Sequence, residues 1–78
     1  MINREFQENS VIKHFKGKEY IFICKAFHSE TGETFAVYRA TYGDKRTYVR
    51  PYDMFISKVD KNKYPDCKQE YRFEVVEV

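Results

Sequence analysis

The sequence predicts an all-β domain, a small antiparallel barrel or sandwich of five to six short strands with one short helical turn near residues 51–55. Three observations lead to this class. Short segments rich in aromatic and β-branched residues recur along the whole chain. Glycine, proline and small polar residues separate these segments. No stretch has the apolar spacing of a long amphipathic helix.

The first half of the chain is predicted to form three strands. VIKHF at 11–15 is a short first strand, and a turn at Gly17 leads into EYIFICKAF at 19–27. HSETG at 28–32 places polar residues and a glycine between two apolar runs, which predicts a hairpin loop. ETFAVYRATY at 33–42 follows as the third strand.

The chain then turns back and meets a proline. The GDK segment at 43–45 predicts a turn, and RTYVR at 46–50 returns as a strand. Pro51 has no amide hydrogen to donate to a strand ladder, but it suits the first position of a helix. Residues 51–55 are therefore predicted to form one helical turn, with Met54 and Phe55 packed beneath it.

The last part of the chain resumes the strand pattern. ISKV at 56–59 predicts a short strand, and DKNKYPDCKQ at 60–69 predicts a polar loop. The final segment, from residue 70 onward, alternates between the two sides of a strand. One side carries Tyr71, Phe73 and Val75, and the other carries Arg72 and Glu74.

Length and composition limit the classes of function. The 78 residues form a single domain, residues 1–78, in which residues 1–9 either remain a loose arm or add a contact through Phe6. A domain of this size has little room for a deep catalytic cleft. Lys and Arg number 14 and Asp and Glu 12, and the charges are mixed along the chain rather than gathered in a tail.

Location can also be predicted from composition. The longest apolar run, at 20–24, is far shorter than the roughly 20 residues of a membrane helix, so no membrane partner is expected. The first ten residues lack the apolar core of a secretory signal. Cys24 and Cys67 are too few for a disulfide framework and are expected to remain reduced, Cys24 as a small buried residue, in a cytoplasmic protein.

Four motifs resemble a known family. HFKGKEY at 14–20, AFHSETGE at 26–33, VYRATYGD at 37–44 and YVRPYDMF at 48–55 are similar, in order and spacing, to successive motifs of a bacterial and phage family called domain of unknown function 1653. The resemblance covers roughly residues 11–60, the family-like core, together with YRF at 71–73. It implies an SH3-type small β-barrel and no particular reaction, since the family has no established activity.

The chain departs from the family pattern in one region. Tyr48 stands where the family usually has a tryptophan before VRP. Arg46 and Thr47 replace a small or apolar pair, and Tyr52 and Asp53 stand where leucine and glutamate are usual. These substitutions retain ring, size and charge, so the expected architecture is the same.

Catalytic and metal sites are not predicted. Cys24 and His28 are four residues apart in or beside a strand, so their Cα atoms are expected about 13 Å apart, whereas a nucleophile and its base lie about 3 Å apart. The potential zinc ligands His14, Cys24, His28 and Cys67 lack paired spacing. His28 is expected instead to bond a backbone group in its loop. No cofactor, metal or enzymatic activity is expected.

The segment VYRATYGDKRTYVRP at 37–51 is the predicted binding face. A two-residue turn would place Arg39 opposite Tyr48, and a three-residue turn would place Tyr38 opposite Arg50. Both registers put Arg46, Tyr48 and Arg50 on one side of the sheet. Two guanidinium groups around a ring are able to stack on a base or hold a phosphate or carboxylate. Cross-strand packing of Arg against Tyr is the alternative explanation.

We therefore expect a non-enzymatic small β-barrel that acts as an interaction module. Exposed tyrosine beside arginine is typical of interaction surfaces, so a protein or peptide is the expected partner. The alternative is a nucleic acid bound by the same face, with affinity that falls steeply as salt rises. The candidate binding residues are Tyr38, Arg39, Tyr42, Arg46, Tyr48, Arg50 and Pro51, with His28 and Glu30 from the neighbouring loop.

Overall fold

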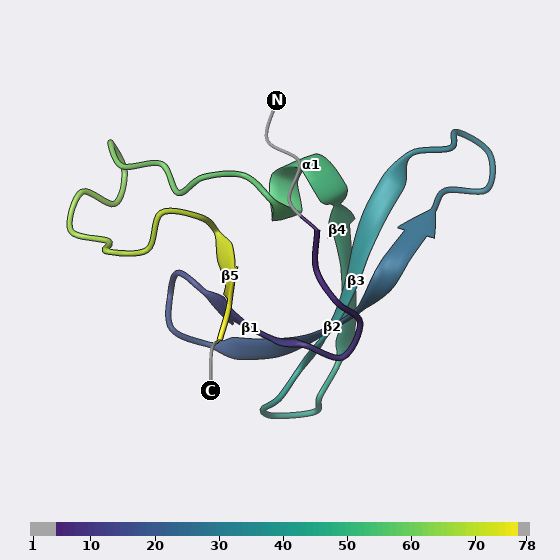
Figure 1. The fold of residues 1–78 in the computed structure, drawn as a ribbon, viewed down its shortest axis with the longest axis horizontal. Helices are drawn as coiled ribbons and strands as arrows, with labels where there is room; N and C mark the ends of the chain where they lie inside the picture. The colour runs from purple at the N-terminus through teal and green to yellow at the C-terminus, as the bar shows by residue number, and fades with distance from the viewer. Residues whose placement is uncertain (1–4, 77–78) are drawn as a thin grey trace.

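The computed structural model describes residues 5–76 as one five-stranded antiparallel sheet and one short helix (Figure 1). The strand order is β4-β3-β2-β1-β5, and the predicted all-β class is confirmed. The elements, in chain order, are β1 (Val11–His14), β2 (Glu19–Phe27), β3 (Thr34–Ala40), β4 (Thr47–Pro51), α1 (Tyr52–Phe55) and β5 (Phe73–Val75).

The sheet curls but does not close into a barrel. β4 and β5 are its two edge strands, and within residues 5–76 no strand pairing joins them. Side chains fill the space between these edges instead. The Phe73 ring stacks on Phe55 at 4.4 Å and lies 5.2 Å from the Tyr38 ring. The small barrel expected from the sequence is therefore open: β5 is only three residues long and pairs with β1 alone.

Aromatic rings form most of the core. Seven residues make up the main cluster: Ile12, Phe22, Ala36, Tyr38, Tyr52, Phe55 and Phe73. Phe6 packs against this cluster, with its ring 5.6 Å from Phe22 and 5.2 Å from Phe55, so the contact considered for Phe6 is present. Residues 1–4 of the proposed arm lie outside the described part of the chain.

The helical turn is confirmed, but one of its expected core residues faces outward. Tyr52 and Phe55 are buried, as expected for residues three apart on one helix face. Met54 is 51% exposed, so its predicted place beneath the turn is wrong. Helical spacing places Met54 on another side of the helix from this pair.

Neither predicted register of the β3–β4 hairpin occurs. Val37 pairs with Val49 and Tyr38 with Tyr48. The Ala40 N–H donates to the Arg46 carbonyl at 2.9 Å, so the connection is longer than three residues. Lys45 sits within it at φ 55°, a left-handed backbone conformation that is uncommon for lysine.

A long loop replaces the predicted strand at 56–59. Only an isolated bridge between Lys58 and Tyr71 links the start of this loop to its end. Polar side chains secure its interior: the Lys61 ammonium donates to the Gln69 carbonyl at 2.8 Å, and the Gln69 amide donates to the Lys13 carbonyl at 2.9 Å. The loop extends to the left in Figure 1 and lies beside the β1–β2 turn.

Candidate anion-binding groove

The structure separates the predicted binding residues along β3. Tyr42 and Arg46 lie in the β3–β4 connection at one end, and His28 and Glu30 lie in the β2–β3 loop at the other (Figure 1). The seven residues of β3 hold these ends about 20 Å apart. His28 accepts the Glu30 and Thr31 N–H groups at 3.2 Å through Nδ1, as expected for a loop histidine. These residues therefore do not form one site.

The predicted residues also divide between the two faces of the sheet. Tyr38 pairs with Tyr48, so both rings lie on the core side, where Tyr38 is 5% and Tyr48 40% exposed. Arg39 lies on the opposite face, with Nε 3.5 Å from the Thr47 hydroxyl. Pro51 is half-buried at the end of β4, where it precedes α1.

Arg46 and Arg50 line separate hollows. Arg46 is exposed in the turn, 3.6 Å from the Asp44 carboxylate, and lines a small hollow with Tyr42 and Tyr48. Arg50 is half-buried and lines a different hollow of about 510 Å³. Tyr48 therefore shares a hollow with Arg46 but not with Arg50, unlike the predicted cluster of both guanidinium groups around one ring.

The hollow around Arg50 is strongly basic. It is formed by the β1–β2 turn, the end of β4 and the loop that follows α1. Four cations and one carboxylate line it. The lining residues are His14, Phe15, Lys16, Arg50, Val59, Asp60, Lys63, Tyr64 and Arg72.

Ring contacts hold the two guanidinium groups in place. The Arg50 guanidinium lies 5.8 Å from the centre of the Phe73 ring. The Arg72 guanidinium lies 5.9 Å from the Phe15 ring, and its Nε donates to the Ser57 hydroxyl at 3.3 Å. Such contacts fix the orientation of a long side chain while its terminal N–H groups remain available as donors.

His14 contributes a neutral ring to the same hollow. Burial, reinforced by the charges of Arg50, Arg72 and Lys16, lowers the His14 pKa to about 4. Its Nδ1 accepts the Lys16 N–H at 3.1 Å. The neutral imidazole therefore carries its proton on Nε2, which makes Nε2 the hydrogen-bond donor of this ring.

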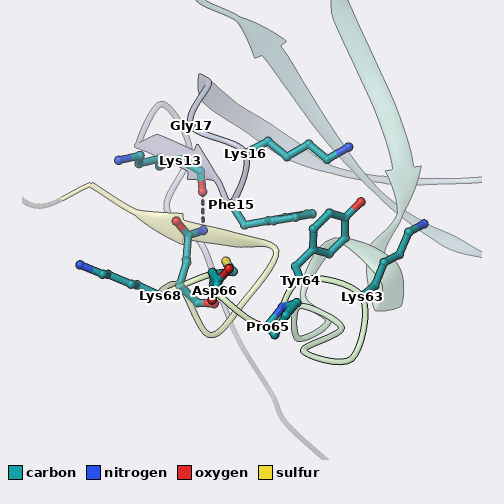
Figure 2. Close-up of a pocket in the computed structure, with 11 residues that line it drawn as sticks. Lys13, Phe15, Lys16, Gly17, Lys63, Tyr64, Pro65, Asp66 and Lys68 are labelled. Atoms are coloured by element: carbon teal, nitrogen blue, oxygen red, sulfur yellow. Dashed lines mark hydrogen bonds between the residues drawn. The ribbon is translucent and has the colours of Figure 1, made fainter.

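A second, wider hollow of about 700 Å³ adjoins the first (Figure 2). The two share Phe15, Lys16, Lys63 and Tyr64. The Phe15 and Tyr64 rings meet edge to face at 4.9 Å, and the Lys16 and Lys63 ammonium groups each lie 5.7 Å from the Tyr64 ring. Figure 2 shows Lys13 and Lys68 at the end of this hollow that is opposite to Tyr64 and Lys63.

We call these two hollows together the basic groove. Six of the 14 Lys and Arg residues of the chain line it, four in the first hollow and two more in the second, against two of the 12 acidic residues. Within residues 5–76 the ion pairs involve other cations: Lys25, Arg46 and Lys58. The charge of the groove is therefore available to an anionic ligand.

Arg50 is the only residue of the basic groove that the sequence analysis predicted to bind a ligand. The signal that was available is an aromatic ring next to a cation in two turn or loop segments, Phe15–Lys16 and Lys63–Tyr64. Their meeting depends on the pairing of β1 with β5, which joins segments about 60 residues apart. No local pattern in the sequence reveals that pairing.

Comparison with known proteins identifies a family but no activity. A family model described as protein of unknown function (DUF1653) matches residues 10–75. No curated protein and no solved structure matches the chain.

Within the described residues, no helix is long and apolar enough to cross a membrane, and no group of three His, Cys, Asp or Glu residues is arranged to hold a metal ion.

Proposed function

We propose that this chain, which belongs to the DUF1653 family, is a non-catalytic binding module for single-stranded nucleic acid. One observation carries the proposal: six cations line two adjoining hollows that share a pair of aromatic rings, Phe15 and Tyr64. Proteins that bind single strands combine cations for the backbone with rings on which bases stack. Cys24 and Cys67 are not joined in a disulfide, which supports a cytoplasmic location as part of the proposal.

The distribution of charge supports this ligand better than the net charge of the chain does. A formal charge of +2 is small, but four excess positive charges line the basic groove. A strand that places three or four phosphates there would release counterions, with a slope of log affinity against log salt of about −2 to −3. Each removed phosphate contact lowers the magnitude of that slope by about 0.7.

Fluorescence anisotropy with labelled oligonucleotides tests the proposal. Short single-stranded and duplex DNA and RNA of mixed sequence are titrated with the protein at about 50 mM and about 200 mM salt. We expect tighter binding of single strands than of duplexes, weakened by Lys63→Gln and by Tyr64→Ala. Lys45→Gln removes one exposed charge outside the basic groove and serves as the matched control, with affinity unchanged.

Two results would contradict this function. One is the absence of binding to any oligonucleotide at the lower salt concentration. The other is equal weakening by Lys63→Gln and by Lys45→Gln, which would mean that net charge alone attracts the strand. In the second case the basic groove would not be the binding site.

A protein or peptide ligand at β4 is the second candidate. β4 is an edge strand, and its Val49 and Tyr48 side chains are 63% and 40% exposed. An extended peptide is able to add to such an edge through backbone hydrogen bonds. This candidate predicts a protein partner that is captured by the wild type, is lost with Val49→Lys, and is retained with Lys63→Gln.

A further inference from the structure

We infer that the first hollow of the basic groove receives the terminal phosphate of a nucleic-acid strand, while the adjoining nucleotides pass over Phe15 and Tyr64 into the second hollow. The inference deepens the proposed function and rests on it. It assigns the two hollows different roles: one recognises an end group, and the other holds the chain that follows.

Charge distinguishes an end group from an internal phosphate. The first hollow is lined by one carboxylate, Asp60, and by four cations, Lys16, Arg50, Lys63 and Arg72. The net charge of these side chains is +3. The Asp60 carboxylate already accepts the Asn62 N–H at 3.0 Å through Oδ1. An internal phosphodiester carries one negative charge, whereas a terminal phosphate carries about 1.5 to 2 at pH 7. The terminal phosphate therefore offsets more of the local positive charge.

The donors of the first hollow also suit a phosphoryl group. The two guanidinium groups belong to half-buried residues at opposite edges of the sheet, Arg50 in β4 and Arg72 just before β5. Each guanidinium is a planar fork that matches two phosphate oxygens. The Nε2–H of His14 adds a neutral donor, since Nδ1 accepts the Lys16 N–H. A terminal phosphate offers three oxygens for these groups, whereas a phosphodiester has two of its four oxygens in ester bonds.

The second hollow favours a nucleic-acid strand over a phosphorylated peptide. Beyond the rings it is lined by Lys13 and Lys68, in addition to the shared Lys16 and Lys63, against the single carboxylate of Asp66. A nucleic acid carries a further negative charge at every nucleotide, so its next phosphates meet these lysines. A phosphopeptide carries no such repeated charge. Cations lie directly beside the rings in the basic groove, as phosphates lie beside bases along a strand.

Oligonucleotides that differ only at their ends provide the test. One labelled single-stranded sequence is prepared with a 5′-phosphate, with a 3′-phosphate and with neither, and the dissociation constants are measured with the full chain. We expect one of the two phosphorylated forms to bind about fivefold more tightly or better than the unphosphorylated form. Arg72→Gln should reduce this ratio toward one. Lys68→Gln, in the second hollow, should weaken all three forms by a similar factor and preserve the ratio.

A second set of measurements distinguishes a loss of phosphate binding from a folding defect. Thermal melting establishes that Arg72→Gln is folded, and the wild-type His14 ring signals are followed by NMR during titration. The preferred phosphorylated strand should shift these signals and raise the His14 pKa from about 4, since an anion beside the ring favours its protonated form.

Each alternative result has a distinct meaning. Equal affinities for the three ends would refute the terminal-phosphate inference while the proposed function stands. No binding of any strand would refute both. Tighter binding of a phosphoserine peptide than of every oligonucleotide would refute the nucleic-acid ligand and assign the first hollow to a protein partner.

Discussion

Replacement of Phe55 by alanine should remove a large part of the stability of this domain. The Phe55 side chain is 0% exposed, and its ring lies 4.4 Å from Phe73, 5.2 Å from Phe6 and 5.4 Å from Tyr38. A Phe→Ala change at such a site costs about 3–5 kcal/mol, through lost burial and the cavity that remains. At 0.05–0.15 kcal/mol per residue, a chain of 78 residues has about 4–12 kcal/mol in total.

Urea unfolding measures this loss directly. The chain has seven tyrosines and no tryptophan, so tyrosine fluorescence and circular dichroism are suitable probes. The matched control is Phe27→Ala, because Phe27 is 69% exposed on β2 and the same atoms are removed. Phe55→Leu should fall between the two. A loss below about 1 kcal/mol for Phe55→Ala, or a loss equal to that of the control, would mean that the rings between β4 and β5 do not hold the open barrel together.

Two further predictions concern the backbone and pH. Gly43 sits at φ 58° in the β3–β4 turn, so Gly43→Ala should cost about 1 kcal/mol and Gly43→Asn less, as measured by urea unfolding; equal costs would refute the backbone explanation. The His14 pKa is about 4 in the folded state and 6.5 in its ordinary state, so the unfolded chain binds more protons between these values. Stability should therefore fall as pH drops from about 6.5 to about 4, and His14→Gln should flatten this dependence in thermal melts. An NMR titration midpoint near 6.5 for His14 in the folded protein would contradict this.

Most strand positions could be predicted because local composition determines them in this chain; the exception is the segment 56–59, which lies in a loop. The predicted segment 19–27 coincides with β2, since an uninterrupted aromatic and β-branched run lies between two turn segments. The predicted strand at 33–42 contains β3, and Pro51 marks the start of the helical turn as expected. All three glycines have positive φ, which agrees with their predicted turns.

The hairpin register and the basic groove depend on features that lie outside local composition. Lys45 adopts a left-handed conformation that lysine seldom takes, so the sequence points to a shorter turn than the one observed. The loop that follows α1 acquires its position from Gln69 and Lys61, whose partners are backbone carbonyls rather than particular side chains. Backbone partners of this kind leave no complementary residue type for a sequence pattern to reveal.

The contact between the β1–β2 turn and the last loop has a consequence for synthesis of the protein. The Phe15 N–H donates to the Arg72 carbonyl at 3.0 Å, so one wall of the basic groove is supplied early in translation and the other nearly sixty residues later. A chain still emerging from the ribosome has Phe15, Lys13 and Lys16 of the first wall but no opposing guanidinium from Arg72. Closure of so long a loop is slow and entropically costly. An anion that bridges the two walls would therefore stabilise only a chain in which both walls are present.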